Sequence, residues 1–588
     1  MKFNEQQLEA INHIDGPCAV IAGAGAGKST VLVNRIANLV ENGVYENQIM
    51  AITFTKKSAE DLKAKLNKLG LLNVIVGTFH SVLGRMLYRQ GKNVFNSVPQ
   101  FEVKKAFNTI NYKHDIEDIM SFISYQKCFL KGPHDNFVAK ESAYTDEELS
   151  VYYEKYEELK KSRGAYDFDD WLIEAYKFLV SNPNLPKPHY LMVDEHQDSN
   201  YIQNLLIDLL CPSKNIFVVG DYRQCIYGFR GSEPRYFMNF SKKYPDAKII
   251  NLSYNYRSCS NIVNNSNNFI KNYYGGYEYY VPSIPNNKEN GEITFERYET
   301  AYDEGEDVAN SILNLVQNGV NPKNIAVLFR NHAFIAETEV ALMKRKVPYH
   351  IENEGNFFLS KQILPIISML RLSIDRYDDE ALLQLIQCRC HPFTYFSKKS
   401  VGEMEMMAAS NNCSYVEALS MIVLNYNQQR SVDDFLTILG SIERQAHSGL
   451  ELKKLIDHIV SLLQIKDFIE FNYSSTEEKK NRLISIETLK SFTGGYDIKG
   501  FLDFVKSGKS VQKKEVDDAV QLMTIHKSKG LEFDHVFVVG LQDKKFPSEK
   551  ASLEEEARLF YVAVTRPIKN LHISQIGVYN LFTKQYFR

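Results

Sequence analysis

The sequence has no long apolar run, and this absence excludes a membrane-spanning protein. Its longest apolar stretches, such as NIFVVG and HVFVVGL, have the length of β-strands. A spanning helix needs roughly 20 apolar residues. The N-terminus MKFNEQQLEA is polar and lacks the apolar core of a secretory signal. We therefore expect a soluble, cytoplasmic protein with no membrane partner.

Cysteine is also scarce, with eight residues scattered over 588. No C-x-x-C pair occurs, and the cluster of Cys388, Cys390 and His391, with Cys413 further along, matches no familiar zinc spacing. This pattern favours reduced, buried thiols over a disulfide framework. Metal binding at the cluster is the alternative.

Net charge is nearly absent, at −3, so the chain has no overall positive field to attract nucleic acid. Any contact with DNA or RNA must depend on a local concentration of basic side chains. Hydrophobic residues at 44% and charged residues at 24% are typical of a globular protein. The length is too great for one hydrophobic core and predicts several domains.

Short apolar runs alternate with helical patterns, and this alternation predicts parallel α/β domains. Two polar, helical intervals interrupt it. The stretch NFIKNYYGGYEYYVPSIPNNKENG reads as a loop or an interdomain connection. The predicted organisation is a first α/β domain at 1–85 and 185–254 with a helical insertion at 86–184, and a second at 255–370 and 514–588 with a helical insertion at 371–513.

The stretch AVIAGAGAGKSTVLVNRI, residues 19–36, predicts a phosphate-binding loop. The pattern G-x-x-x-x-G-K-[ST] ends on Gly27, Lys28 and Ser29, which places Ala22 at the position of the first glycine. The backbone N–H groups of such a loop surround phosphate, the lysine reaches the β- and γ-phosphates, and the hydroxyl binds Mg²⁺. Alanine fits if its backbone angles are ordinary. A generic glycine-rich turn is the alternative. The predicted nucleotide contacts are Ala22, Gly23, Ala24, Gly25, Ala26, Gly27, Lys28, Ser29 and Thr30.

An acidic pair follows the strand-like run in HYLMVDEHQDSN. Asp194 is predicted to hold Mg²⁺ together with Ser29, and Glu195 to orient or deprotonate the attacking water. Asp198 is also suited to cap a helix here, and the two interpretations are compatible. The loop and the acidic pair together predict hydrolysis of a nucleoside triphosphate.

Phosphoryl transfer also needs donors and cations from outside the loop. Gln224 in VVGDYRQCIYGFRG, Arg257 in LSYNYRS and Arg566 in FYVAVTRP are the candidates. In isolation, each of these residues is more often a surface side chain or a helix cap. Local chemistry therefore leaves open whether they converge on one phosphate.

With these motifs in place, the chain resembles superfamily 1 DNA helicases of the UvrD/Rep/PcrA type almost end to end. Alanine is common at the first loop position of that family, so Ala22 fits it. The resemblance implies two RecA-like P-loop motor domains, each with a mainly helical insertion. The motifs that carry it, in family order, are FNEQQLEAI, AGAGAGKS, AITFTKKSAEDLKAKL, GTFHSVLGRML, YDFDDWL, VDEHQDSN, VVGDYRQCIYGFRG, LSYNYRS, VQLMTIHKSKGLEFDHVFVVG and EEEARLFYVAVTR.

For the nucleotide, the resemblance implies ATP and Mg²⁺ in a cleft between the two motors. Gln7 would read the adenine, Tyr256 would stack on it, and Glu532 would hold the ribose or couple the ATP state to DNA. ATP would close the cleft and hydrolysis would release it. The residues implied to sense the γ-phosphate are Gln224, Arg257 and Arg566.

For DNA, the resemblance implies single strands and single/double-strand junctions as partners, with rings that stack on bases and polar groups on phosphates. Phe229 stands where several relatives have tryptophan. Core packing is the alternative for each aromatic residue, and we expect about half of the set to touch DNA. Binding is expected to weaken steeply with salt. The predicted DNA-facing residues are Phe54, Thr55, Phe79, His80, Tyr227, Phe229, Arg230, Arg330, Thr524 and His526.

Some residues depart from the family pattern. His196 stands where Phe or Tyr is usual. Tyr222, Arg223 and Cys225 stand where Asp, Asp and Ser are common. None of them replaces a phosphate-handling residue, so ATPase activity is expected to persist. The stretch HPFTYFSKKSVGEM lacks the Gly-x-Gly hairpin with which relatives grip duplex DNA.

The sequence thus predicts an ATP-dependent DNA helicase or translocase that moves 3′→5′ on single-stranded DNA, with the polarity implied by the resemblance alone. The alternative is a DNA-dependent ATPase that remodels protein–DNA complexes and unwinds weakly by itself, which the missing hairpin favours. A DNA-binding module without hydrolysis is disfavoured by the intact phosphate-handling set. The pathway, whether repair, replication, recombination or defence, is left open, as are the partner protein and the oligomeric state.

Overall fold

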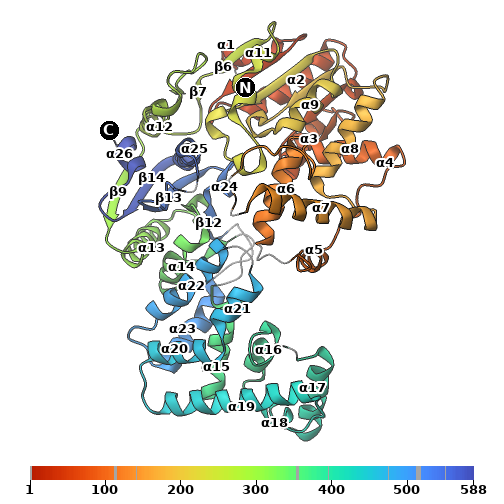
Figure 1. Ribbon diagram of the computed structural model, residues 1–588. Coiled ribbons are helices and arrows are strands. Elements are labelled where there is room, and N and C mark those ends of the chain that lie inside the picture. The colour runs from red at the N-terminus through yellow and green to blue at the C-terminus, as the bar shows by residue number, and fades with distance from the viewer. Residues whose placement is uncertain are drawn as a thin grey trace.

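Two parallel β-sheets, each covered by helices, organise the chain (Figure 1). We call the part around the first sheet the first lobe, and the part around the second sheet the second lobe. This architecture confirms the predicted α/β class with two nucleotide-binding-type domains. The computed structural model describes residues 3–110, 115–140, 142, 144–351, 357–394, 396–473, 476–511, 518–549 and 551–587.

The first sheet has the strand order β3-β2-β4-β5-β1-β6, with every neighbouring pair parallel. Strands β1, β2, β4 and β5 are buried along their whole length because helices cover both faces. Only β5 separates β1 from β4, so the phosphate loop and the acidic pair emerge at one edge. The strands are β1 (Cys18–Ala22), β2 (Ile49–Ile52), β3 (Ile75–Gly77), β4 (Tyr190–Val193), β5 (Asn215–Gly220) and β6 (Lys248–Leu252).

Capping groups mark where several helices of the first lobe begin. Asn4 starts α1 with a capping box, Thr55 caps α3, Thr78 caps α4, and Asn200 caps α9. Asp198 is therefore not the helix cap that the sequence suggested. The helices of this lobe are α1 (Glu5–Asn12), α2 (Lys28–Glu41), α3 (Lys56–Lys68), α4 (Phe79–Arg89), α9 (Tyr201–Leu210), α10 (Pro234–Met238) and α11 (Phe240–Lys243).

The second sheet has the order β11-β12-β10-β13-β14-β9 and is also parallel throughout. Its strands are β9 (Ile293–Tyr298), β10 (Ile325–Phe329), β11 (Tyr349–Ile351), β12 (Val520–Thr524), β13 (Phe533–Gln542) and β14 (Pro567–Ile576). Its helices are α12 (Ser260–Tyr274), α13 (Ala301–Gln317), α14 (Ala336–Lys344), α24 (Ile525–Ser528), α25 (Leu553–Val564) and α26 (Leu581–Tyr586). A short ladder of β7 (Tyr254–Asn255) and β8 (Ile284–Pro285) lies between the sheets in the sequence.

Two helical segments interrupt the lobes, in the intervals where the sequence predicted insertions. Helices α5 (Gln100–Phe107), α6 (Ile116–Cys128), α7 (Asp146–Arg163) and α8 (Phe168–Ser181) lie between β3 and β4. The second set forms the lower body in Figure 1. It comprises α15 (Leu364–Ile374), α16 (Asp379–Cys388), α17 (Lys398–Asn411), α18 (Tyr415–Ala418), α19 (Tyr426–His447), α20 (Leu452–Leu462), α21 (Ile465–Asn472), α22 (Thr476–Ser491) and α23 (Ile498–Val511). The predicted domain boundaries themselves stay a proposal.

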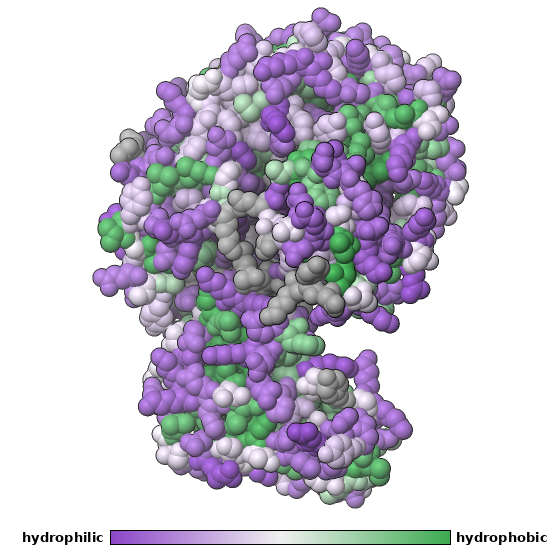
Figure 2. Space-filling model, in the orientation of Figure 1, coloured by the Kyte–Doolittle hydropathy of each residue, from purple (hydrophilic) through white to green (hydrophobic). Residues whose placement is uncertain are grey.

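The face drawn in Figure 2 is mostly hydrophilic, and the molecule narrows where the second helical segment joins the rest. In the part of the chain that the structure describes, no helix is long and apolar enough to cross a bilayer.

A buried charge cluster ties α6, α7 and the start of α8 together. The Nζ atom of Lys127 lies 2.6 Å from Asp167 and 2.7 Å from Asp170. Lys160 lies 2.5 Å from Asp170 and 2.8 Å from Glu157. The three carboxylates are close enough to share a metal ion, and they form the only such grouping of three or more ligands among the described residues. The two ammonium groups pair with all three carboxylates and offset two of their three charges, so the cluster is explained without a metal.

Candidate active site

The phosphate loop joins β1 to α2 with the geometry that the sequence predicted. Ala22 ends β1, is fully buried and has no positive φ, so alanine meets the condition set for it. Gly25 and Gly27 have φ values of 69° and 83°. A Cβ on Gly25 would lie 2.7 Å from Cβ of Arg257, so glycine is required there for space as well as for conformation.

The lysine of the loop points at the acidic pair. Nζ of Lys28 lies 3.1 Å from Oε2 of Glu195, which also accepts a hydrogen bond of 2.6 Å from Gln197. Burial and the neighbouring charge of Glu195 raise the pKa of Asp194. Burial opposes ionisation of Glu195 too, but Lys28 and Lys529 outweigh it and hold the pKa of Glu195 below its usual range. The pair therefore divides into a carboxylate kept ionised and a carboxyl that gains a proton more readily than usual.

Residues from the two lobes meet beside this pair. Nη2 of Arg566 donates a hydrogen bond of 3.0 Å to Oε1 of Gln224. Arg257 pairs with Glu532 at 2.6 Å and donates to the carbonyl oxygen of Thr565. Burial, reinforced by Arg257, lowers the pKa of Arg566 to about 9, so its guanidinium stays charged at neutral pH. The three γ-phosphate candidates from the sequence thus lie together.

The other end of the loop faces the N-terminal segment. Gln7 is buried, and its Nε2 donates to the carbonyl oxygen of Ala26 at 3.3 Å. Asn4 donates to the hydroxyl of Tyr256 at 2.8 Å, while the ring of Tyr256 is 44% exposed. Gln7 and Tyr256, the two predicted adenine contacts, therefore both lie beside the loop, and Asn4 hydrogen-bonds to each of them.

These residues fit ATP and Mg²⁺. The loop leaves its backbone N–H groups at a helix N-terminus, which is an anion site. Ser29 is exposed, and Ser29 and Asp194 offer the hard oxygen ligands that Mg²⁺ prefers. The charge of a bound Mg²⁺ would favour the ionised form of Asp194, which is the form that binds a metal.

Aromatic rings gather where the lobes meet, on a second surface. The rings of Phe54 and Tyr227 stack with centroids 4.9 Å apart. Tyr227 and Phe229 both lie near His526, at 6.4 Å and 6.0 Å. The guanidinium of Arg230 lies over both rings of this pair, at 5.8 Å from Tyr227 and 5.5 Å from Phe229. Five of the predicted DNA-facing residues thus form one basic and aromatic cluster.

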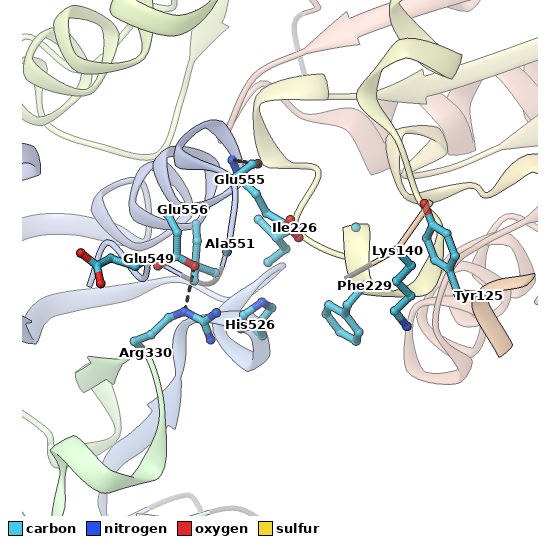
Figure 3. A pocket seen from close by; sticks show the side chains of 13 residues that line it. Tyr125, Lys140, Ile226, Phe229, Arg330, His526, Glu549, Ala551, Glu555 and Glu556 are labelled. Carbon is cyan, nitrogen blue, oxygen red and sulfur yellow. Dashed lines mark hydrogen bonds and ion pairs between the residues drawn. The ribbon is translucent and has the colours of Figure 1, made fainter. Parts of the chain in front are cut away.

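A cavity of about 740 Å³ adjoins this cluster (Figure 3). Phe229 and Lys140 face His526 and Arg330 across it (Figure 3). Arg330 pairs with Glu556 at 3.0 Å, so its charge is already partly neutralised. The volume is large enough for a nucleobase, and the lining combines rings and the cations Lys140 and Arg330 with three glutamates, Glu549, Glu555 and Glu556.

Phe79 does not belong to this surface, whereas His80 lies close enough to Arg230 of the cluster for its charge to act on the His80 ring. Phe79 is only 5% exposed and packs in the core of the first lobe, so its prediction as a stacking ring was wrong and the core-packing alternative holds. His80 lies 5.8 Å from Phe168 and 6.3 Å from Trp171, and burial lowers its pKa. Its ring is therefore a packing partner that stays neutral. Thr55 caps α3 through its hydroxyl, and Thr524 is the residue just before α24.

One residue of this site was missed from the sequence. Lys529 lies in the quoted motif TIHKSKGLEF, between His526 and Glu532. Its Nζ donates to the backbone carbonyl of Gln224 at 2.7 Å and pairs with Asp198. It also lies 5.1 Å from the centroid of Tyr227. Its place between two predicted residues was the signal that could have found it.

The cysteine cluster shows the expected burial. Cys390 is buried, and burial raises its pKa to about 12. Cys388 and Cys413 are partly buried. Neither joins a grouping of three or more metal ligands in the described ranges.

The motif order and the two-lobe site have a match among known families. Residues 3–245 match the UvrD/REP helicase N-terminal domain, and residues 250–577 match the UvrD-like helicase C-terminal domain. The chain therefore belongs to the UvrD/Rep helicase family.

Three similar proteins are each named ATP-dependent DNA helicase PcrA. The one from Staphylococcus aureus is 30% identical, covering 99% of this chain and 84% of that protein. The one from Leuconostoc citreum is 31% identical, covering 97% of this chain and 81% of that protein. The one from Staphylococcus epidermidis is 29% identical, covering 99% and 84%.

The raised pKa of Asp194 predicts a gain of stability on neutralising this residue. Such a carboxyl destabilises the folded state increasingly as pH rises from its ordinary pKa, near 4, toward the raised value. We expect Asp194→Asn to increase the free energy of unfolding by about 2 kcal/mol at pH 8, and by less at pH 5. The measurement is urea denaturation of both proteins at the two pH values.

The matched control is Asp246→Asn, at an exposed aspartate of the same lobe. This control is expected to shift the urea midpoint at neither pH. An Asp194→Asn gain that is equal at pH 5 and pH 8, or a loss, would contradict the assignment.

Proposed function

We propose that this chain is an ATP-dependent DNA helicase that moves 3′→5′ on single-stranded DNA and couples ATP hydrolysis between its lobes to strand separation. The observation that carries the proposal is the contact of Gln224 with Arg566 across the lobes, next to the pair of Lys28 and Glu195. Membership of the helicase family supports the use of ATP and DNA. The polarity follows from the resemblance alone.

In the proposed mechanism, ATP binds with its base between Gln7 and Tyr256 and its phosphates on the loop. Lys28 neutralises the β- and γ-phosphates. Ser29 and Asp194 would hold Mg²⁺, which supplies charge neutralisation at the phosphates when bound.

Hydrolysis then needs a general base for the attacking water and cations that stabilise the negative charge on the transferred phosphoryl group. Glu195 is kept ionised by neighbouring ammonium groups, so it can accept a proton from the attacking water. Arg257 and Arg566 bring positive charge from the second lobe to the transferred phosphoryl group, with Gln224 beside them. Because these groups come from both lobes, their contacts with the γ-phosphate would hold the lobes together. Loss of the γ-phosphate would remove those contacts and destabilise the closed arrangement.

The DNA strand is proposed to lie on the cluster of Phe54, Tyr227, Phe229, Arg230 and His526. Stacking is tolerant of sequence because every base has a flat face, which suits a protein that moves along DNA. Burial and nearby cations lower the pKa of His526 to about 4, so it offers a neutral ring and a hydrogen-bonding nitrogen. Arg330, with its charge shared with Glu556, lies on the opposite wall of the cavity.

One observation favours a second function, the remodelling of protein–DNA complexes with weak unwinding. Residues 371–513 contain no Gly-x-Gly, and Gly402 of the relevant stretch lies inside α17. A hairpin that grips duplex DNA therefore has no glycine turn at this place. Such a protein would keep the DNA-stimulated ATPase and lose the duplex contact.

The proposed ATPase function predicts that Lys28→Ala lowers the DNA-stimulated kcat at least about 100-fold, because a cation on the transferred phosphate is lost. The measurement is ATP turnover with and without oligothymidine. Lys248→Ala, at a half-exposed lysine paired with Glu9, is the matched control and should turn over ATP normally. Circular dichroism checks the fold. Strand separation that persists in the Lys28→Ala variant would contradict the proposal.

The DNA surface predicts that Tyr227→Ala weakens binding of oligothymidine by about 5- to 100-fold, since one stacking platform is lost. Fluorescence anisotropy measures the affinity. Phe79→Ala is the informative control. It is expected to destabilise the first lobe by about 3–5 kcal/mol through a buried cavity, and to leave the affinity of the folded protein unchanged. Equal loss of affinity in both variants would contradict this assignment of the surface.

Polarity and the second function are separated by paired assays. The helicase proposal predicts that the purified chain unwinds a duplex with a 3′ single-stranded tail and not one with a 5′ tail. Displacement of streptavidin from a biotinylated oligonucleotide, with little unwinding of either duplex, would favour the remodelling function. Unwinding from the 5′ tail would refute the polarity.

A further inference from the structure

Arg223 stands where the family commonly has aspartate, and its side chain is only 2% exposed. It lies in the short turn of residues 222–224 that follows β5. A guanidinium buried to this degree needs partners, because an unpaired charge is very unfavourable away from water. Its contacts therefore show what it does in this chain.

The first partner is Asp221, which has no exposed surface. Nε of Arg223 donates to Oδ1 of Asp221 at 2.7 Å, and the backbone N–H of Arg223 donates to the same oxygen at 3.1 Å. The second carboxylate oxygen, Oδ2, accepts a hydrogen bond of 2.8 Å from Nε2 of Gln224. One carboxylate thus holds both Arg223 and the side-chain amide of Gln224.

The amide of Gln224 is oriented by this arrangement. A carboxylate only accepts hydrogen bonds and a guanidinium only donates them. The amide must therefore turn its NH₂ to Asp221 and its oxygen to Arg566, where the O···N distance is 3.0 Å. The result is a continuous relay from Arg223 through Asp221 and Gln224 to Arg566 of the second lobe.

Arg223 also packs this relay against the phosphate loop. A Cβ placed on Gly23 would lie 2.9 Å from Nη2 of Arg223, so the guanidinium contacts the loop directly. Nη1 donates to the carbonyl oxygen of Val281 at 3.4 Å, and the ring of Tyr561 in α25 lies 5.7 Å away. The same side chain therefore touches the loop, the connecting segment and the second lobe.

We propose that Arg223 is a positioning residue for ATP hydrolysis: it fixes Asp221, through Asp221 it orients Gln224 toward Arg566, and it registers this relay against the phosphate loop. The inference rests on the proposed ATPase function. It assigns no contact between Arg223 and DNA, because the side chain is buried. A displacement of about 1 Å in such a relay is enough to lower a rate about 100-fold.

The test measures kcat and KM for ATP at saturating oligothymidine, together with thermal unfolding, for four variants. Arg223→Met is expected to lower kcat about 100-fold with KM changed less than about threefold. Arg223→Lys keeps the charge without the planar fork and is expected to recover only part of kcat. Arg235→Met, at an exposed arginine paired with Glu233 in the same lobe, is the control and should match the natural chain.

The fourth variant, Asp221→Asn with Arg223→Met, separates positioning from charge neutralisation. It leaves no unpaired buried charge, so thermal stability is expected to return toward that of the natural chain. The amide introduced in place of the Asp221 carboxylate can donate as well as accept, so it no longer dictates the orientation of Gln224, and kcat is expected to stay low. If Arg223→Met alone does not fold, this double variant decides the question.

Two results would overturn the inference. One is a kcat for Arg223→Met within about twofold of the Arg235→Met control. The other is recovery of both stability and kcat in the double variant, which would reduce Arg223 to a counter-ion. A natural chain without DNA-stimulated ATP hydrolysis would instead overturn the proposed function, and the inference with it.

Discussion

The hydrogen bond between Gln224 and Arg566 is the contact on which the rest of the site depends. Both side chains are nearly fully buried, at 3% and 1% exposure, and they come from different lobes. A buried amide and a buried guanidinium have lost their hydration, and this bond gives the amide oxygen of Gln224 a donor, while Arg566 also donates to the carbonyl oxygens of Val562 and Leu531. A change in the relative position of the lobes therefore also changes the arrangement of the phosphate site. A ligand that binds both lobes can shift the two together.

The same logic links the phosphate site to the ring cluster through Lys529. This lysine of the second lobe is bonded to Asp198 and to the backbone of Gln224, and its ammonium lies over the ring of Tyr227. It also contributes to holding Glu195 ionised. A DNA strand that displaces Tyr227 or stacks on it would therefore affect Lys529, whose charge influences the ionisation of Glu195. This gives a physical route by which DNA can stimulate hydrolysis in the proposed function.

Much of the fold could be predicted because buried parallel strands read as continuous apolar runs. CAVIA, YLMV and NIFVVG are all fully buried strands of the first sheet. The phosphate loop was equally legible, since Gly25 and Gly27 have the positive φ values that its formula encodes. The sequence pattern was sufficient to predict a feature wherever the interactions that determine it lie within a few residues along the chain.

The failures have the opposite cause. Phe79 and Tyr227 are both aromatic residues in helicase motifs, but Phe79 faces the core and Tyr227 faces the ring cluster. That difference depends on how α4 packs against the first lobe, and the spacing of residues within the motif does not reveal this packing. Asp198 looked like a helix cap, but Asn200 two residues later takes this role and leaves Asp198 for Lys529 of the other lobe. A contact between residues 331 positions apart cannot be read from either neighbourhood.

The unusual residues at 222 and 223 show how such distant contacts constrain sequence. The ring of Tyr222 packs against Tyr274 and Tyr277, at 5.3 Å and 5.0 Å, and Arg223 donates to the carbonyl oxygen of Val281. The tyrosine-rich stretch was predicted as a loop, but its first residues, up to Tyr274, belong to α12; together with the segment that follows, it covers this turn. A large ring and a buried cation after β5 need apolar and carbonyl partners, and the connecting segment supplies both. The two departures and the tyrosine-rich connection therefore form a single packing unit, and changing one without the other would leave a buried charge or a cavity beside the phosphate loop.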